Sequence, residues 1–304
     1  MTANARAWQR LMPEPRPGLR LVTWATWMRE SVNGLLPVAR IGGEVVAYRV
    51  IRRHVERRSD AAASLIADMG LSILSQASFG LFGLALLFVL GGTTAVTAQL
   101  AVGVVAMIPL GVGFALAQRY GALAALTRFL HRLFAGRLSG VQTHSLRVDR
   151  ALRAVHERRR DVRACFLWQL AGWALGAGEI WLALYFLGHP GSLVAGLAIE
   201  ALIQALSSAV FLVPAAIGVQ EGAFILIGAA LGIDAATALA LATARRLRDV
   251  VIFFPGLIAW QWAEASMRHA KSANPSPGAR EPAVNERSVA YSNLSQQRRQ
   301  EEQR

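Results

Sequence analysis

Long apolar runs separated by short polar segments dominate the chain. Residues 71–90 pass without a charged side chain, and residues 98–118 do the same. A helix needs about 20 apolar residues to cross the hydrocarbon of a bilayer, so these runs predict membrane spans at about 64–90 and 98–118. Similar runs predict spans at 164–187 and 236–262. The expected fold class is therefore all-α, a polytopic integral membrane helical bundle.

Two further apolar segments, at about 19–47 and 193–233, are interrupted in the same way. Residues 31–44 read SVNGLLPVARIGGE and residues 208–221 read SAVFLVPAAIGVQE, so each places a glutamate after a proline with a glycine between them. Backbone groups freed by Pro and Gly at membrane depth must face protein or a wet cavity. Paired interruptions indicate a transporter site between two repeats, which can be inverted. The alternative is a chance match between two kinked helices.

The pattern divides the chain into three parts. Residues 1–18 form an N-terminal polar segment, which we expect to be the remainder of a truncated upstream span. Residues 19–262 form the membrane domain, whose broken stretch 193–233 either spans as two short helices or re-enters the membrane. Its polar loop 119–163 is amphipathic, and it either lies in the membrane interface or is a solvated connector. Residues 263–304 are rich in Ser, Asn, Gln and charge, and we expect a disordered cytoplasmic tail.

Arginines are distributed unevenly among the loops. They crowd residues 49–58 and 119–163, whereas loops 91–97, 188–192 and 232–235 contain no Arg or Lys. The positive-inside rule places the Arg-rich loops and the C-terminus in the cytoplasm, and it predicts a multi-pass protein of the bacterial inner membrane. The formal net charge of +13 then follows from topology and attraction to anionic headgroups, so no nucleic-acid partner is expected.

Ionisable residues inside the apolar segments are the candidates for function. A charge at the bilayer centre costs at least about 2.5–3.5 kcal/mol, so such residues face a partner or a cavity. Asp68 lies near a helix end, where it can cap or snorkel. The arginines of the last span are expected to pair with the carboxylates of the broken segments, for instance Glu221 with Arg245 or Arg246, or to bind a lipid phosphate. Purely structural ion pairing is the alternative. The remaining candidates are Glu44, Glu179, Glu200, Arg248 and Asp249.

Catalytic and metal-binding motifs are missing from the sequence. It contains no GxSxG, P-loop or HExxH motif, and Cys165 is its single cysteine. We therefore expect no catalytic residue, no metal site and no cofactor, and an enzyme is not indicated. A membrane transferase that works with scattered carboxylates and arginines is still compatible with the sequence.

Four strings together resemble the lysylphosphatidylglycerol synthase transmembrane-region family. They are NGLLPVARIGGE (33–44), AAASLIAD (61–68), FLVPAAIGVQEGAF (211–224) and ARRLRDVVIFFPGLIAW (244–260). The likeness covers roughly residues 19–262 and is greatest to the branch associated with hopanoid biosynthesis. It implies an integral inner-membrane protein with flippase-like relatives, although the soluble aminoacyl-transfer domain is missing. The positions that the resemblance implies for lipid or substrate binding are Pro37, Gly42, Gly43, Glu44, Pro214, Gly218, Glu221, Arg245, Arg246 and Arg248.

The expected function is translocation or handling of a polar lipid, either an anionic phospholipid or a hopanoid. The resemblance links this function to hopanoid biosynthesis or transport. Two alternatives stay open: a membrane-embedded transferase acting on lipid headgroups, and a non-catalytic scaffold of a lipid-synthesis complex. A homo-oligomer or partners in lipid synthesis are compatible with the sequence.

Cysteine labelling tests the predicted orientation. In a Cys165→Ser background, Thr94→Cys and Ser192→Cys should react with a membrane-impermeant thiol reagent in intact cells. Ser145→Cys should stay unlabelled, because it lies in an Arg-rich loop on the cytoplasmic side. Labelling of Ser145→Cys from outside would contradict the orientation.

Overall fold

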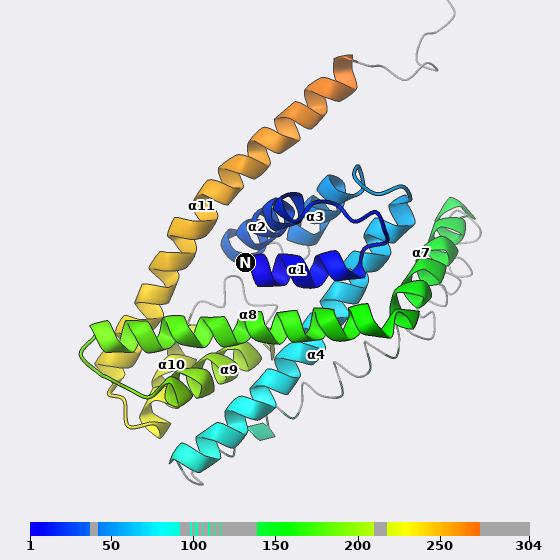
Figure 1. The fold of residues 1–304 in the computed structure, drawn as a ribbon. Coiled ribbons are helices and arrows are strands. Elements are labelled where there is room, and N and C mark those ends of the chain that lie inside the picture. The colour runs from blue at the N-terminus through cyan, green and yellow to red at the C-terminus, as the bar shows by residue number, and fades with distance from the viewer. Residues whose placement is uncertain are drawn as a thin grey trace, which may run out of the picture. The chain divides into compact units, whose positions relative to one another are not determined.

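All regular structure in the described part of the chain is helical (Figure 1). The computed structural model describes residues 1–36, 42–91, 139–209 and 218–273, with a few isolated positions between 98 and 116. The predicted all-α class is confirmed. The predicted span at 98–118 lies almost wholly outside the described residues. Pro37 and Pro214 also lie outside them.

The described helices keep the labels of Figure 1. They are α1 (Thr2–Leu11), α2 (Leu19–Leu35), α3 (Gly42–Ile51), α4 (Arg58–Gly91), α7 (Ser139–Glu157), α8 (Arg159–Phe186), α9 (Leu193–Ala209), α10 (Val219–Ala230) and α11 (Ala235–Ala273). The chain divides into two compact units, Met1–Ile258 and Ala259–Arg304. In the second unit the described residues are the end of α11, which is helical through Ala273 although the sequence predicts a tail from residue 263.

Helix α4 has the length and composition of a membrane span. Its 34 residues extend about 51 Å, against a hydrocarbon thickness of about 30 Å. Among the described helices it alone, over Arg58–Leu90, is both long and apolar enough to cross a membrane. The two segments predicted to be broken each consist of two helices, α2 with α3 and α9 with α10. Leu193–Leu206 of α9 and Gln220–Ala230 of α10 are shorter apolar helices.

Helix α9 lies at the centre of the larger apolar core, between α4, α8 and α10. Its Leu202 and Ile203 pack with Leu87 of α4 and Phe224 of α10, all of them buried. Close approach of α4 to α9 depends on Gly83, because a Cβ there would stand 2.3 Å from the Cβ of Ala201. Small residues at helix crossings let membrane helices pack closely where no hydrophobic driving force acts between them.

A second core joins α1, α4, α7 and α8. Leu11 of α1 and Leu152 and Val155 of α7 are buried there with Ala67 and Cys165. The sequence pattern predicts no helix at residues 1–18, yet α1 packs along α8 and buries Trp8 completely. Likewise, the amphipathic pattern of residues 139–157 belongs to a helix whose apolar face packs on α4. This part of the 119–163 loop is therefore a packed element of the bundle, rather than a solvated connector.

The last helix has a defined start. Asp234 precedes α11, and its carboxylate accepts hydrogen bonds from the Thr237 hydroxyl at 2.6 Å and the Thr237 backbone N–H at 2.9 Å. These donors lower the pKa of Asp234 below its ordinary value. The arrangement is an N-cap, which satisfies a backbone donor that the first helical turn leaves without a partner.

Two glycine substitutions test the α4–α9 crossing. Gly83→Ala should destabilise the protein by about 1–3 kcal/mol, because the added methyl group overlaps Ala201. Gly178→Ala in α8 is the matched control, since a Cβ there meets no atom within 4 Å. The measurement is the unfolding free energy in detergent. Equal stability of the two variants would contradict the packing.

Candidate functional site

Four ionisable side chains meet between α2, α3 and α4, and we call Arg29, Glu30, Glu44 and Asp68 the Arg29 cluster. Arg29 Nη1 lies 2.8 Å from Asp68 Oδ2 and 3.8 Å from Glu44 Oε2, and its Nε lies 3.2 Å from Glu30 Oε1. The Trp8 ring covers the guanidinium, with its centroid 5.5 Å from Cζ. Arg29 is 8% exposed and Asp68 2% exposed. A buried charge is tolerated only when it is paired and hydrogen-bonded, so these residues depend on one another.

Asp68 is also fixed from the opposite side by α8. Gln169 Nε2 donates to Asp68 Oδ1 at 3.0 Å, while Gln169 Oε1 accepts from the Ser75 hydroxyl at 2.9 Å. Trp173 Nε1 donates to the same hydroxyl at 3.2 Å. Asp68 therefore neither caps its helix nor snorkels to a surface, the two roles that its sequence position allowed. It is the buried partner of an arginine 39 positions earlier in the chain.

Glu44 reaches the Arg29 cluster because α3 approaches α2 very closely. The backbone N–H of Gly43 donates to Asn33 Oδ1 at 2.9 Å, and Asn33 Nδ2 donates to Glu44 Oε1 at 3.5 Å. A Cβ at Gly43 would stand 2.2 Å from the carbonyl oxygen of Arg29. Glycine is thus required sterically at position 43, and Gly42 begins the helix.

Three arginines of α11 pair with carboxylates from three other helices, and we call Arg245, Arg246 and Arg248 the α11 arginines. Arg245 binds both oxygens of Glu200 on α9, with Nη2 3.1 Å from Oε1. Gln204 also donates to Glu200 Oε1, at 2.8 Å. Glu200 is 2% exposed, so this pair is the buried one of the three.

The other two pairs are partly exposed. Arg246 Nε donates to Glu221 Oε1 of α10 at 3.0 Å, and these side chains are 31% and 27% exposed. Arg248 pairs with Glu179 of α8 and with Asp249. The α11 arginines therefore form ion pairs within the protein, the structural alternative of the sequence analysis. Two of their partners, Glu200 and Glu221, come from the two helices of the broken segment 193–233, and the third, Glu179, comes from α8.

Glu221 has a second contact, at the start of α10. Its Oε2 accepts a hydrogen bond from the backbone N–H of Gly218 at 2.7 Å, and Gly218 has a φ of +82°. A left-handed backbone of this kind is accessible mainly to glycine. Gly218 and Glu221 thus form the N-terminal cap of the helix, while Glu221 also binds Arg246.

The structure does not bring the two glutamates of the repeated pattern together. Glu44 contacts Arg29 and Asn33, whereas Glu221 contacts Arg246 and Gly218. The two carboxylates belong to different charge clusters. Arg29 was missed by the sequence analysis, although an arginine inside a predicted membrane segment is a signal in itself.

Contacts between α2 and α11 connect the Arg29 cluster with the α11 arginines. Trp27 Nε1 donates to the carbonyl oxygen of Ile252 at 2.9 Å. Pro255 lies inside α11 and has no backbone N–H, so the carbonyl group four residues before it lacks its helical donor. The Ile252 carbonyl is the next one along the helix. The backbone of Gly256 lies against Ser31, where a Cβ would overlap the Ser31 hydroxyl oxygen at 2.0 Å.

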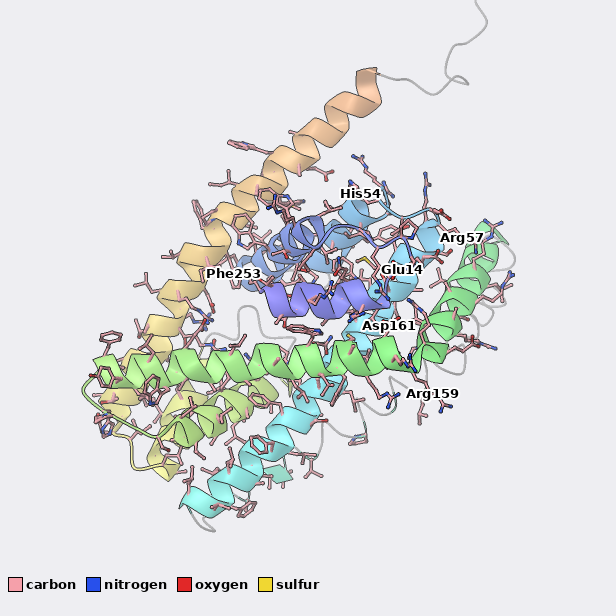
Figure 2. All side chains as sticks on the ribbon, in the orientation of Figure 1. Glu14, His54, Arg57, Arg159, Asp161 and Phe253 are labelled. Carbon is pink, nitrogen blue, oxygen red and sulfur yellow. The ribbon has the colours of Figure 1, made fainter. Side chains whose placement is uncertain are left out.

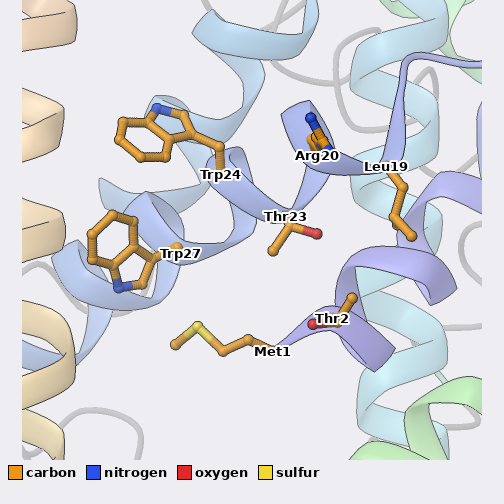
Figure 3. Close-up of a pocket in the computed structure, with 7 residues that line it drawn as sticks. All are labelled: Met1, Thr2, Leu19, Arg20, Thr23, Trp24 and Trp27. Carbon is orange, nitrogen blue, oxygen red and sulfur yellow. The ribbon is translucent and has the colours of Figure 1, made fainter.

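An apolar groove lies between the start of α1 and α2 (Figure 3). Its cavity volume is about 560 Å³. Trp24 and Trp27 lie side by side on α2, with ring centroids 5.3 Å apart in an edge-to-face arrangement, and Trp24 is 46% exposed. Arg20 is the charged side chain of the lining. The lining residues are Met1, Thr2, Leu19, Arg20, Thr23, Trp24 and Trp27.

A third group of charges surrounds Asp161 near the start of α8 (Figure 2). Arg16 Nη2 lies 3.0 Å from Asp161 Oδ2, while Arg158 and Arg10 approach its oxygens at 3.5 and 3.7 Å. Arg158 also donates to the carbonyl oxygen of Met12 at 3.0 Å. These contacts hold the end of α1 and the chain after it on α8, so their role is structural. No group of acidic, His or Cys side chains in the described segments is arranged to hold a metal ion.

Residues 2–256 match the family described as lysylphosphatidylglycerol synthase TM region. The chain belongs to this family. It is therefore a lipid-associated integral membrane protein, and the resemblance seen in the sequence is confirmed at the level of the family. No curated protein and no solved structure matches the chain.

Charge reversal tests the pairing of Glu221 with Arg246. Glu221→Arg and Arg246→Glu alone should each lower stability, because each places two like charges side by side. Combining them should restore part of the loss, with a coupling energy of about 0.2–1 kcal/mol in a double-mutant cycle of unfolding free energies. Recovery should be incomplete, since arginine cannot accept the Gly218 hydrogen bond. Purely additive effects of the two changes would refute the pair.

Proposed function

We propose that this protein binds a polar lipid and translocates or handles it within the bacterial inner membrane, without catalysing a reaction. The observation that carries the proposal is the groove between α1 and α2. Its volume of about 560 Å³ lies in the usual range for ligand sites, about 300–1,000 Å³. Membership of a family named for lipid synthesis supports it.

The lining of the groove suits an amphipathic ligand. Trp24, Trp27 and Leu19 offer apolar surface for an acyl chain or a ring system, and indole rings favour the boundary between hydrocarbon and headgroups. Arg20 adds a positive charge, which attracts an anionic headgroup by about 1 kcal/mol near a membrane surface. An anionic phospholipid combines both properties.

The partly exposed ion pairs of α11 offer a second place for a headgroup. The Arg246–Glu221 and Arg248–Glu179 pairs are between 27% and 54% exposed, whereas Arg245 and Glu200 are 11% and 2% exposed. An exposed ion pair is worth about 0–1 kcal/mol, so a phosphate can displace its carboxylate at little cost. The Arg245–Glu200 pair is then the structural support, and Arg246 and Arg248 are the arginines that exchange partners.

We further propose a link to hopanoid biosynthesis or transport, on the resemblance of the sequence to that branch of the family. A squalene–hopene cyclase gene in the genomic neighbourhood would support the link. Its consistent absence from the neighbourhood of closely similar chains would count against it and would leave the lipid-binding proposal untouched.

Lipid movement in proteoliposomes tests the groove. We expect wild-type protein to carry a fluorescent phosphatidylglycerol analogue between leaflets, detected by a membrane-impermeant quencher. Thr23→Trp should reduce the rate roughly tenfold or more, corresponding to about 1.4 kcal/mol, because it fills the groove. Arg20→Glu should slow the anionic analogue more than a zwitterionic phosphatidylcholine analogue, since it removes the attractive charge and adds a repulsive one.

Arg53→Glu is the matched control, an exposed arginine outside the groove. It should leave the rate unchanged at equal protein content. Unaltered transport by both Thr23→Trp and Arg20→Glu would refute the groove as the lipid site. If the wild type moves no lipid and instead modifies a headgroup, detected by mass spectrometry, the transferase alternative replaces the proposal. If it does neither, the scaffold alternative replaces it.

A further inference from the structure

Among the residues that the structure describes, the Arg29 cluster contains more carboxylates than cations. Asp68, Glu30 and Glu44 lie 2.8, 3.2 and 3.8 Å from the nitrogens of one guanidinium. With one positive and three negative charges, the fully ionised cluster has a net charge of −2 inside the helix bundle. Burying uncompensated charge costs far more than burying a neutral carboxyl group. Binding a proton is the simplest way for the cluster to lose one negative charge.

The hydrogen bonds show which carboxyl group lacks donors for its ionised form. Asp68 accepts from Arg29 at one oxygen and from Gln169 at the other, so both of its oxygens are satisfied. Glu30 is 30% exposed, and water can solvate it. The oxygens of both groups therefore have partners, from protein donors for Asp68 and from water for Glu30.

Glu44, in contrast, lacks good hydrogen-bond partners for its carboxylate oxygens. Its side chain is 15% exposed, and its Oε2 is fully buried with no hydrogen-bond donor among the described residues. In the described part of the chain its other oxygen meets only the Asn33 amide, at 3.5 Å, which is the outer limit of a hydrogen bond. We propose that Glu44 is a proton-binding site, protonated when α3 is held against α2 as the structure shows.

Because Glu44 lies at the contact between α2 and α3, gain or loss of its proton changes how these two helices pack. Glu44 follows Gly43, whose backbone contacts Asn33 and Arg29 of α2 without room for a Cβ. Its charged neighbours are Arg29 and Glu30 from α2 and Asp68 from α4. When Glu44 releases its proton, the new carboxylate is repelled by two others and competes with them for one guanidinium. Deprotonation therefore weakens the contact between α2 and α3, and protonation restores it.

Infrared spectroscopy of the reconstituted full-length protein detects the proton directly. Wild type near neutral pH should show the C=O stretch of a protonated, buried carboxyl group, which disappears as the pH is raised. Glu44→Gln should lose this band, because glutamine cannot carry the proton. Glu221→Gln is the matched control and should keep it, since Glu221 is balanced by its own arginine.

Stability measurements give a second, independent readout. A carboxyl group that is neutral in the folded protein stabilises it at low pH, and this contribution is lost as the pH rises through ionisation in the folded state. Between about pH 5 and about pH 9, the interval between an ordinary glutamate and a strongly buried one, wild type should lose stability. Glu44→Gln should match wild type at the acidic end and depend less on pH.

Three outcomes would overturn the proposal. The first is the absence of a protonated carboxyl band from wild type at every pH. The second is survival of the band in Glu44→Gln. The third is loss of the band in Asp68→Asn with no change in Glu44→Gln, which would place the proton on Asp68. None of these results depends on whether the protein moves lipid, so the test is independent of the proposed function.

Discussion

The contact of Arg29 with Asp68 is the interaction on which the N-terminal half of the bundle depends. It joins α2 to α4 through a buried ion pair, and the partners of its two members extend the connection to α1, α3 and α8. Breaking a buried pair by removing one member costs about 3–5 kcal/mol, because the remaining charge stays buried. The pair therefore fixes which faces of five helices meet, in addition to any contribution to stability.

The α11 arginines connect helices of the C-terminal half through ion pairs, as Arg29 does in the N-terminal half. Neighbouring positions on one helix reach three different partners, Glu179 of α8, Glu200 of α9 and Glu221 of α10. A single helix thus gathers the other three through charge, while the apolar core of α9 supplies the packing. In the proposed function a lipid phosphate competes with these carboxylates for the guanidinium groups, and the more exposed pairs, Arg246–Glu221 and Arg248–Glu179, are the ones open to exchange.

The parts predicted from the sequence are those decided by local composition. The run at 71–90 predicts a span because its 20 residues are mostly apolar and carry no charge, and it lies in α4. Pairing of Glu221 with Arg245 or Arg246 was expected from the rule that charges in apolar segments need partners, and Arg246 is the partner found. The partner of Asp68 was not found, because the pairing joins residues 39 positions apart and no local pattern encodes it. Helix α1 was missed for a related reason, since its buried face contains Ala5, Ala7 and Trp8 within a polar stretch.

The hydrogen bond from Trp27 to the Ile252 carbonyl has a consequence for motion. It joins α2, eight residues before its end at Leu35, to α11, three residues before Pro255, where a proline weakens the helix. The tight contact of Gly256 with Ser31 lies beside it. Bending of either helix at this point therefore breaks the hydrogen bond or moves the other helix with it. Because α2 carries Arg29 and Glu30 as well as Trp24 and Trp27, a displacement of α2 moves the Arg29 cluster and the wall of the groove together.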